Sequence, residues 1–129
     1  MFSYQQTTGK LAHNGTHVAV GYSGHGDGKN NPECESLANI GPLPRGIFNM
    51  EVITDDDGNP CDYEGKKAPV IRLHPSPTNE MYGRAGFLIH GDSVSTPGTA
   101  SLGCIVENHD ERVYIATAIA QGDNILEVV

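Results

Sequence analysis

The sequence predicts a small, mainly β protein, a sandwich or barrel with two short helices. Three observations support this fold class. The chain has 129 residues, which suits one domain over residues 1–129, and no internal repeat is visible. It contains 16 glycines and 8 prolines, which favour turns and short strands over long helices. Its apolar residues stand mostly in short runs of strand length, bounded by turn residues.

The expected strands follow one another along the chain with polar turns between them. Several contain β-branched and aromatic residues and end at glycine, proline or acidic clusters. The segments with this pattern are residues 2–11 with a turn, 17–22, a strand beginning at Gly46, an extended segment through Tyr63, 68–75, 87–89, 105–106 and 124–129.

Two segments have the signals of short helices. Asn31 at the N-cap, Pro32 at the first helical position and Glu33 in the first turn predict a helix over residues 33–40. Asn108 and Glu111 have the spacing of a capping box, which predicts a second helix over 112–121 that ends at Gly122.

Two loops were compared with ligand-binding motifs. Residues 23–31 are rich in glycine, but Lys29 is followed by asparagine where a phosphate loop needs serine or threonine. This loop is interpreted as a rim over a cleft or as a plain surface loop. Residues 55–60 imitate the start of a calcium loop, but Pro60 replaces the glycine and Lys66 stands where the glutamate belongs.

The strongest chemical signal is a histidine that precedes a cysteine, His90 and Cys104, with apolar strand residues beside each. A cysteine attacks as the thiolate, and an ordinary pKa of about 8.5 leaves few thiols ionised at neutral pH without a nearby base. The preceding Gly103 predicts a tight bend with positive φ, which can aim the amides of Gly103 and Cys104 at an oxyanion. The competing interpretation is a buried structural thiol and a core histidine.

The segments GRAGFLIHGDS and ASLGCIV resemble the active site of YkuD-like L,D-transpeptidases, and most closely the small L,D-transpeptidase-like effectors of type VI secretion systems. FSYQQTTGKL, GYSGHGDGKNNP and GPLPRGIF extend the likeness over nearly the whole chain. Leu102 departs from the pattern, because the common motif has histidine or arginine there. Ile105-Val106 also departs from the usual hydrophobic residue followed by a polar one.

The resemblance implies a YkuD-like fold and a cysteine enzyme that acts on peptidoglycan tetrapeptide stems. Cys104 would attack the bond before the terminal D-alanine, and a thioester acyl-enzyme would form. Water as acceptor gives L,D-carboxypeptidase activity, whereas an amine gives L,D-transpeptidase activity or D-amino acid exchange. The expected role is that of an antibacterial effector toxin, with a possible cognate immunity protein and secretion-system components as partners.

Further site residues were predicted with this reaction in view. In the family the histidine is oriented by a neighbouring backbone carbonyl, which places that role at Gly91, with the Asp92 side chain as the alternative. Ser101 occupies the motif's Ser/Thr position, where it would bond within the loop or to substrate. Arg84 and Arg45 carry forked donors that suit the carboxylates of a stem peptide, and Asp92 also counts among the substrate-binding candidates.

The sequence is also compatible with two alternatives to this enzyme. One is a catalytically inactive module that binds stem peptides in the same cleft. The other is a zinc-dependent amidase that uses His90, Cys104 and a further histidine. The remaining histidines lack the paired spacing of zinc ligands, so the sequence predicts no metal and no cofactor.

The composition bears on partners and location. The formal net charge of −8 disfavours a nucleic-acid surface and adhesion to anionic lipid, so neither nucleic acid nor membrane is expected as a partner. The N-terminal residues have no signal-peptide pattern. Synthesis in the cytoplasm, secretion, and action in the periplasm of a target bacterium are the expectation. Cys34 and Cys61 are expected to be unpaired structural residues.

Overall fold

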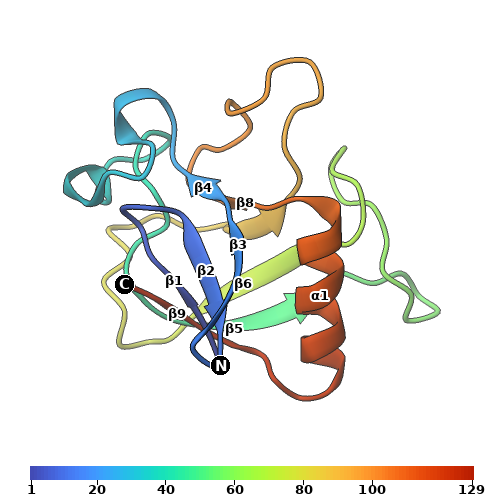
Figure 1. Cartoon of the computed structure of the whole chain (residues 1–129). Helices are drawn as coiled ribbons and strands as arrows, with labels where there is room; N and C mark the ends of the chain where they lie inside the picture. The colour runs from blue at the N-terminus through green and yellow to red at the C-terminus, as the bar shows by residue number, and fades with distance from the viewer.

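The computed structural model describes residues 1–129 and consists mainly of β strands with one α helix (Figure 1). The strands are β1 (Phe2–Tyr4), β2 (Lys10–His13), β3 (Thr16–Val20), β4 (Tyr22–Ser23), β5 (Gly46–Val52), β6 (Ile71–Pro75), β7 (Leu88–His90), β8 (Ile105–Val106) and β9 (Ile125–Val128). The α helix is α1 (His109–Ala120), and two short 3₁₀ turns are η1 (Gly26–Gly28) and η2 (Pro32–Cys34). The mainly β fold class is confirmed.

All nine strands form one sheet in the order β3-β2-β1-β9-β5-β6-β7-β8-β4. Neighbouring strands are antiparallel except for two parallel pairs, β1 with β9 and β7 with β8. The strands at the two ends of this order, β3 and β4, are consecutive in the chain, and one residue separates them. The sheet therefore curls into a nearly closed barrel.

Gly21 is the residue between β3 and β4, and its lack of a side chain lets the barrel come so near to closure. Its N–H donates a 2.8 Å hydrogen bond to the carbonyl of Gly9. A Cβ at this position would lie 2.2 Å from the carbonyl oxygen of Val106. Any larger residue would push the β3–β4 connection away from β8.

The hydrophobic core fills the inside of the barrel and extends to the helix. Residues from most of the strands contribute, among them Phe2, Phe48 and Ile89, each at most 1% exposed. The helix α1 contacts β5 and turns Ile115 and Ala118 toward the core, three residues apart on one helical face. No helix in the structure is long and apolar enough to cross a membrane.

The prediction of a helix over 33–40 is wrong, because only the 3₁₀ turn η2 forms there. Asn31 does cap that turn, since its side-chain oxygen accepts the N–H of Glu33 at 3.1 Å. The carbonyl of Glu35, which an α helix would bond internally, instead accepts a hydrogen bond from the guanidinium of Arg84. The buried arginine thus takes an acceptor that the helix would need.

The second helix is confirmed as α1, which ends before Gly122 at a φ of +90°. The predicted capping box is wrong, because the Asn108 side chain makes no capping hydrogen bond although the residue occupies the N-cap. A strand begins at Gly46 as predicted. The segment before Tyr63 is not a strand, since residues 53–66 pair only through the isolated bridges Thr54–Pro60 and Tyr63–Lys66.

Candidate active site

The parallel pair β7–β8 brings the predicted base and nucleophile together on one face of the sheet. Ile89 lies opposite Ile105, and both side chains enter the core. Because side chains alternate along a strand, His90 and the residue just before β8, Cys104, point to the other face. Adjacent parallel strands thus place the imidazole and the thiol on the same side of the sheet. The sequence predicts such an arrangement, because apolar strand residues lie beside His90 and Cys104 and a polar connector joins the two strands.

His90 is held by the backbone next to it. Its Nδ1 lies 2.7 Å from the carbonyl oxygen of Gly91, and because a carbonyl only accepts, Nδ1 carries the proton and Nε2 is left free. Burial lowers the pKa of His90 below its ordinary value, the Gly91 carbonyl opposes this, and the charges of Lys66 and Arg112 lower the pKa further. The imidazole is therefore neutral at neutral pH and can accept a proton at Nε2.

Cys104 is half-buried and carries a free thiol. The backbone N–H of Leu88, across the strand pair, donates to its Sγ at 3.3 Å. Burial raises the pKa of the Cys104 thiol above its ordinary value, although the Leu88 N–H, Lys66 and Arg84 each act to lower the pKa. No hydrogen bond joins the thiol to the His90 ring, so the free protein holds a neutral thiol and a neutral imidazole at adjacent strands.

The turn that presents Cys104 requires a glycine at position 103. Gly103 has a φ of +140°, as the expected bend demands, and a Cβ there would lie 2.6 Å from the Arg84 guanidinium and 2.8 Å from the Phe87 ring. Two buried serines hold this turn. Ser23 Oγ donates to the Gly103 carbonyl at 2.9 Å, and Ser101 Oγ donates to the Cys104 carbonyl at 2.6 Å.

The two predicted oxyanion donors differ in their availability. The N–H of Gly103 is already used, since it donates to Ser101 Oγ at 3.1 Å. The N–H of Cys104 has no partner in the structure. Ser101 itself is fully buried and also accepts the N–H of Gly24 at 2.9 Å. Its predicted contact with substrate is therefore corrected to a contact within the loop, and Cys104 N–H is the free donor.

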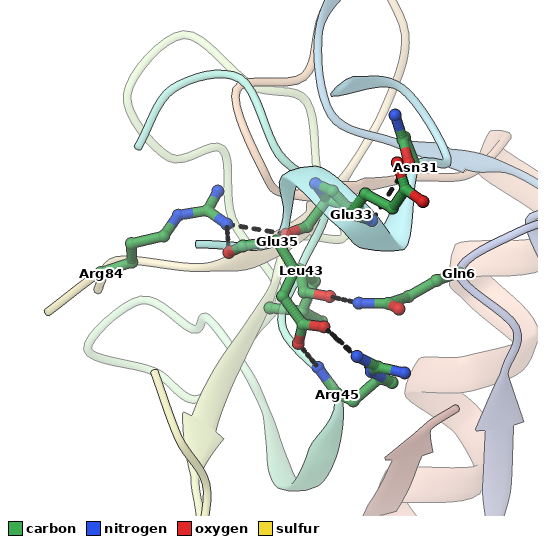
Figure 2. Close-up of polar contacts among 8 residues, drawn as sticks. Gln6, Asn31, Glu33, Glu35, Leu43, Arg45 and Arg84 are labelled. Carbon is green, nitrogen blue, oxygen red and sulfur yellow. Dashed lines mark hydrogen bonds and ion pairs between the residues drawn. The ribbon is translucent and has the colours of Figure 1, made fainter. Parts of the chain in front are cut away.

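The arginines predicted to bind substrate carboxylates are engaged elsewhere (Figure 2). The buried Arg84 guanidinium donates to the carbonyls of Glu35, Pro42, Gly41 and Leu102, at 2.6 to 3.4 Å. Arg45 forms an ion pair with the buried Glu35 carboxylate at 2.5 Å. Both assignments are corrected: Arg84 supports the loops behind the turn of Cys104, and Arg45 neutralises a buried acid.

Asp92 organises the connector between β7 and β8 rather than the histidine. It accepts hydrogen bonds from the Tyr22 hydroxyl at 2.6 Å, from Ser93 N–H at 2.8 Å and from Gly98 N–H at 3.0 Å. Partial burial raises the pKa of Asp92, but these donors outweigh burial and lower the pKa overall. The Tyr22 hydroxyl also accepts Ala100 N–H at 2.9 Å, so the loop is fastened to β4 at both ends.

A cleft of about 740 Å³, lined mostly by polar residues, opens beside His90. Its walls come from the turn at Lys66, from the start of the connector at Gly91 and from the first turn of α1 at Arg112. Lys66 in the cleft, Tyr22 at the connector and Ser23 behind the turn of Cys104 were not predicted as site residues. No local motif marks them, because they belong to segments far from His90 and Cys104 that only the curled sheet brings near.

The structure contains no disulfide and no cluster of metal-ligating side chains. Cys34, Cys61 and Cys104 are all free thiols. No group of three or more histidine, cysteine, aspartate or glutamate side chains is placed so as to hold a metal ion. A zinc centre built on His90 and Cys104 has no third ligand of these kinds in the structure.

A cysteine acyl-transfer centre needs a thiol, a base that takes its proton and an N–H donor for the oxyanion. The Cys104 thiol, the neutral His90 ring with its free Nε2 and the unpartnered Cys104 N–H match these three parts. The chain belongs to the Tlde1 domain family, whose sequence model matches residues 17–129. This is a family of L,D-transpeptidase effectors of type VI secretion systems, so membership indicates a peptidoglycan-modifying enzyme of transpeptidase type that is secreted against target bacteria. Searches of curated proteins and of solved structures gave no match.

Proposed function

We propose that this protein is a cysteine-dependent L,D-carboxypeptidase and L,D-transpeptidase that cleaves peptidoglycan tetrapeptide stems through an acyl-enzyme on Cys104. The observation that supports this most directly is the parallel pairing of β7 and β8, which puts Cys104, the residue just before β8, next to the strand of His90, whose ring is fixed by the Gly91 carbonyl. Family membership supplies the reaction class.

The first half of the reaction begins with a small rearrangement. When substrate enters, rotation of the Cys104 side chain brings Sγ to His90 Nε2, which takes its proton. The thiolate attacks the carbonyl carbon before the terminal D-alanine, and the oxyanion accepts the free Cys104 N–H. The carbon–nitrogen bond then breaks, the proton passes from His90 to the departing amine, and a thioester is left on Cys104.

The second half removes the acyl group. Water or the amine of a D-amino acid or another stem attacks the thioester while His90 accepts its proton, and the proton returns to the sulfur as the carbon–sulfur bond breaks. The cleft beside His90 is open and lined mostly by polar residues, so water can reach the His90 side of the site and hydrolysis is an available outcome.

The test is the release of D-alanine from purified tetrapeptide muropeptides. The wild type is expected to release it, and Cys104→Ala and His90→Gln are expected to remove that release while the domain stays folded by circular dichroism. Intact-mass spectrometry of the wild type should detect the acyl adduct. Release that persists in Cys104→Ala would refute the mechanism, and affinity for muropeptides without any turnover in the wild type would make the protein a stem-peptide binding module.

We also propose, from the effector family, that the protein acts in the periplasm of target bacteria and that a cognate immunity protein blocks the cleft beside His90. Expression directed to the periplasm should inhibit growth, and Cys104→Ala should not. Equal inhibition by both would refute enzymatic toxicity.

A further inference from the structure

Most of the cations of this chain already have partners. The chain has 8 lysines and arginines in all. Arg84 and Arg112 are buried and donate to backbone carbonyls, Arg45 pairs with Glu35, and Lys67 pairs with Asp62 at 3.3 Å. Lys29 lies over the Tyr22 ring, and Arg72 lies over the Tyr63 ring. Lys10 and Lys66 have neither an ion pair nor a contact with an aromatic ring, and of these two only Lys66 lines the cleft that contains His90.

Lys66 is held at this place by a tight turn. Tyr63 and Lys66 exchange two backbone hydrogen bonds of 2.9 Å, and the two residues between them, Glu64 and Gly65, have positive φ of 48° and 79°. Such a two-residue turn is stiff, so the position of the Lys66 backbone is well defined. The side chain is half-buried, which makes its charge more effective toward an anion than that of a fully exposed lysine.

The charge of Lys66 reaches both reacting groups. After burial, which is the larger effect at each site, Lys66 lowers the pKa of His90 and also lowers that of Cys104. Arg112 acts in this way only on His90, and Arg84 only on Cys104. Lys66 therefore lies within electrostatic range of both the imidazole and the thiol.

The chemistry of the leaving group indicates which charged group would lie near the unpaired ammonium of Lys66. In the reaction proposed above, His90 protonates the departing amine, so the leaving residue must lie on the His90 side of Cys104. In a tetrapeptide stem that residue is the last one, and its carboxylate is joined to the carbon that carries this amine. A negative charge therefore enters the cleft together with the scissile bond.

We propose that Lys66 binds the terminal carboxylate of the leaving residue and so makes the enzyme selective for stems that end in a free acid. This inference rests on the proposed function. Two acidic residues line the cleft, and neither neutralises Lys66. Asp92 accepts hydrogen bonds from Tyr22 and from the connector amides, and Glu64 makes no ion pair. A stem whose terminal carboxylate is amidated carries no charge for the ammonium to bind.

The first experiment compares tetrapeptide stems with a terminal acid and a terminal amide. The wild type is expected to prefer the acid by about tenfold or more in kcat/KM, the range of a charged hydrogen bond. Lys66→Gln should lose most of the preference for the acid over the amide, mainly through the KM for the acid. The matched control is Lys67→Gln, the neighbouring lysine that also lines the cleft but pairs with Asp62, and this variant should keep the wild-type preference.

The outcomes separate the two proposals. A wild type that cleaves acid and amide equally well, or a Lys66→Gln variant that keeps the preference, overturns the role of Lys66 while the proposed function stands. A wild type that cleaves neither stem overturns the proposed function and this inference with it.

A second experiment needs no turnover. Cys104 can be alkylated by iodoacetate, which carries a carboxylate, or by neutral iodoacetamide, and mass spectrometry of the Cys104 peptide reports each rate. The ratio of the two rates cancels any change in the thiol pKa. Lys66→Gln should lower the ratio of iodoacetate to iodoacetamide several-fold, and Lys67→Gln should not. An unchanged ratio in Lys66→Gln would show that Lys66 does not attract carboxylates to this thiol.

Discussion

The Ser23 hydroxyl donates a hydrogen bond of 2.9 Å to the carbonyl of Gly103, the residue immediately before the proposed nucleophile. The same oxygen accepts the backbone N–H of Leu43 at 2.8 Å, and Ser23 is fully buried. If the hydroxyl is removed, neither the Gly103 carbonyl nor the Leu43 N–H can form a hydrogen bond with water instead. The turn that presents Cys104 therefore depends on a serine in β4, far away in the sequence.

Ser23→Ala is expected to destabilise the protein and to slow turnover. It leaves the Gly103 carbonyl and the Leu43 N–H unpaired, which should lower the free energy of unfolding by about 1–3 kcal/mol, measured by urea denaturation. The control is Ser36→Ala, where the serine is exposed and makes no hydrogen bond, and its effect should stay within about 0.5 kcal/mol. Similar losses in both variants would contradict the role given to Ser23.

Gly103→Ala tests the shape of the same turn. The added Cβ would stand 2.6 Å from the Arg84 guanidinium and 2.8 Å from Phe87, at a φ of +140°. Gly86→Ala is matched to it, because Gly86 also has positive φ, +82°, but no atom within 4 Å of the added Cβ. We expect Gly103→Ala to cost about 1–3 kcal/mol more than Gly86→Ala in urea denaturation. Equal costs would mean that backbone strain alone, and no close packing, explains the glycine.

The sequence was informative where the signal is local. Gly46 begins a strand as its pattern indicates, α1 forms where the second helix was expected, and Gly103 has the positive φ that a tight turn requires. The short β7 and β8 were expected from only a few apolar residues beside His90 and Cys104. Each of these predictions uses residues that lie next to one another in the chain.

The sequence predictions failed where a residue far away in the chain binds a backbone group that local structure would otherwise use. Asn31 and Pro32 are sound helix-start signals, yet Arg84 takes the Glu35 carbonyl and the helix does not continue. Arg84 was expected to face substrate, because its forked donors suit a carboxylate, but nothing local shows that they are used by backbone carbonyls. Lys66 was considered only as a failed calcium ligand, since its place beside His90 depends on the curled sheet.

The pH dependence of the reaction should reveal the resting state of the pair. Burial lowers the pKa of His90 below its ordinary 6.5 and raises the pKa of Cys104 above its ordinary value. The reactive form is then the neutral pair, so kcat/KM on tetrapeptide should rise with pH below 6.5, stay level through neutral pH and fall only above 9.0. A pH series with purified enzyme measures both limbs.

Alkylation of the free enzyme provides the complementary measurement for the same pair. Iodoacetamide reacts with the thiolate, so its rate at Cys104 should rise with pH with a midpoint above 9.0, and His90→Gln should leave that midpoint nearly unchanged. A midpoint below neutrality that moves upward in His90→Gln would show a resting thiolate–imidazolium pair instead.

Glu107 is a buried acid outside the proposed reaction, and it should make stability depend on pH. It is 2% exposed, its Oε2 has no hydrogen-bond partner, and a Cβ on Gly21 would lie 2.5 Å from that oxygen. Burial, and then the charge of Glu111 four residues later in the chain, raise the pKa of Glu107 from 4.5 to about 8. The fold therefore favours the protonated carboxyl.

Because the pKa of Glu107 is raised in the folded protein, this group makes the folded state less stable as the pH rises. Below pH 4.5 the carboxyl is protonated in both the folded and the unfolded chain, and its burial carries no ionisation cost. As the pH rises from 4.5 toward about 8, the unfolded chain releases the proton while the folded chain keeps it, so unfolding becomes easier by at most about 1.4 kcal/mol per pH unit. Above about 8 the folded carboxyl ionises as well, and no further loss follows from this group.

Glu107→Gln isolates this contribution from the other titrating groups. The variant is neutral at every pH, so its stability relative to the wild type should increase steadily between pH 5 and about pH 8, as measured by urea denaturation at several pH values. Glu33→Gln, which replaces an exposed glutamate, should show no such trend. A constant difference between Glu107→Gln and the wild type over this range would mean that Glu107 is ionised in the folded protein, and that the unpaired Oε2 has a partner in solution.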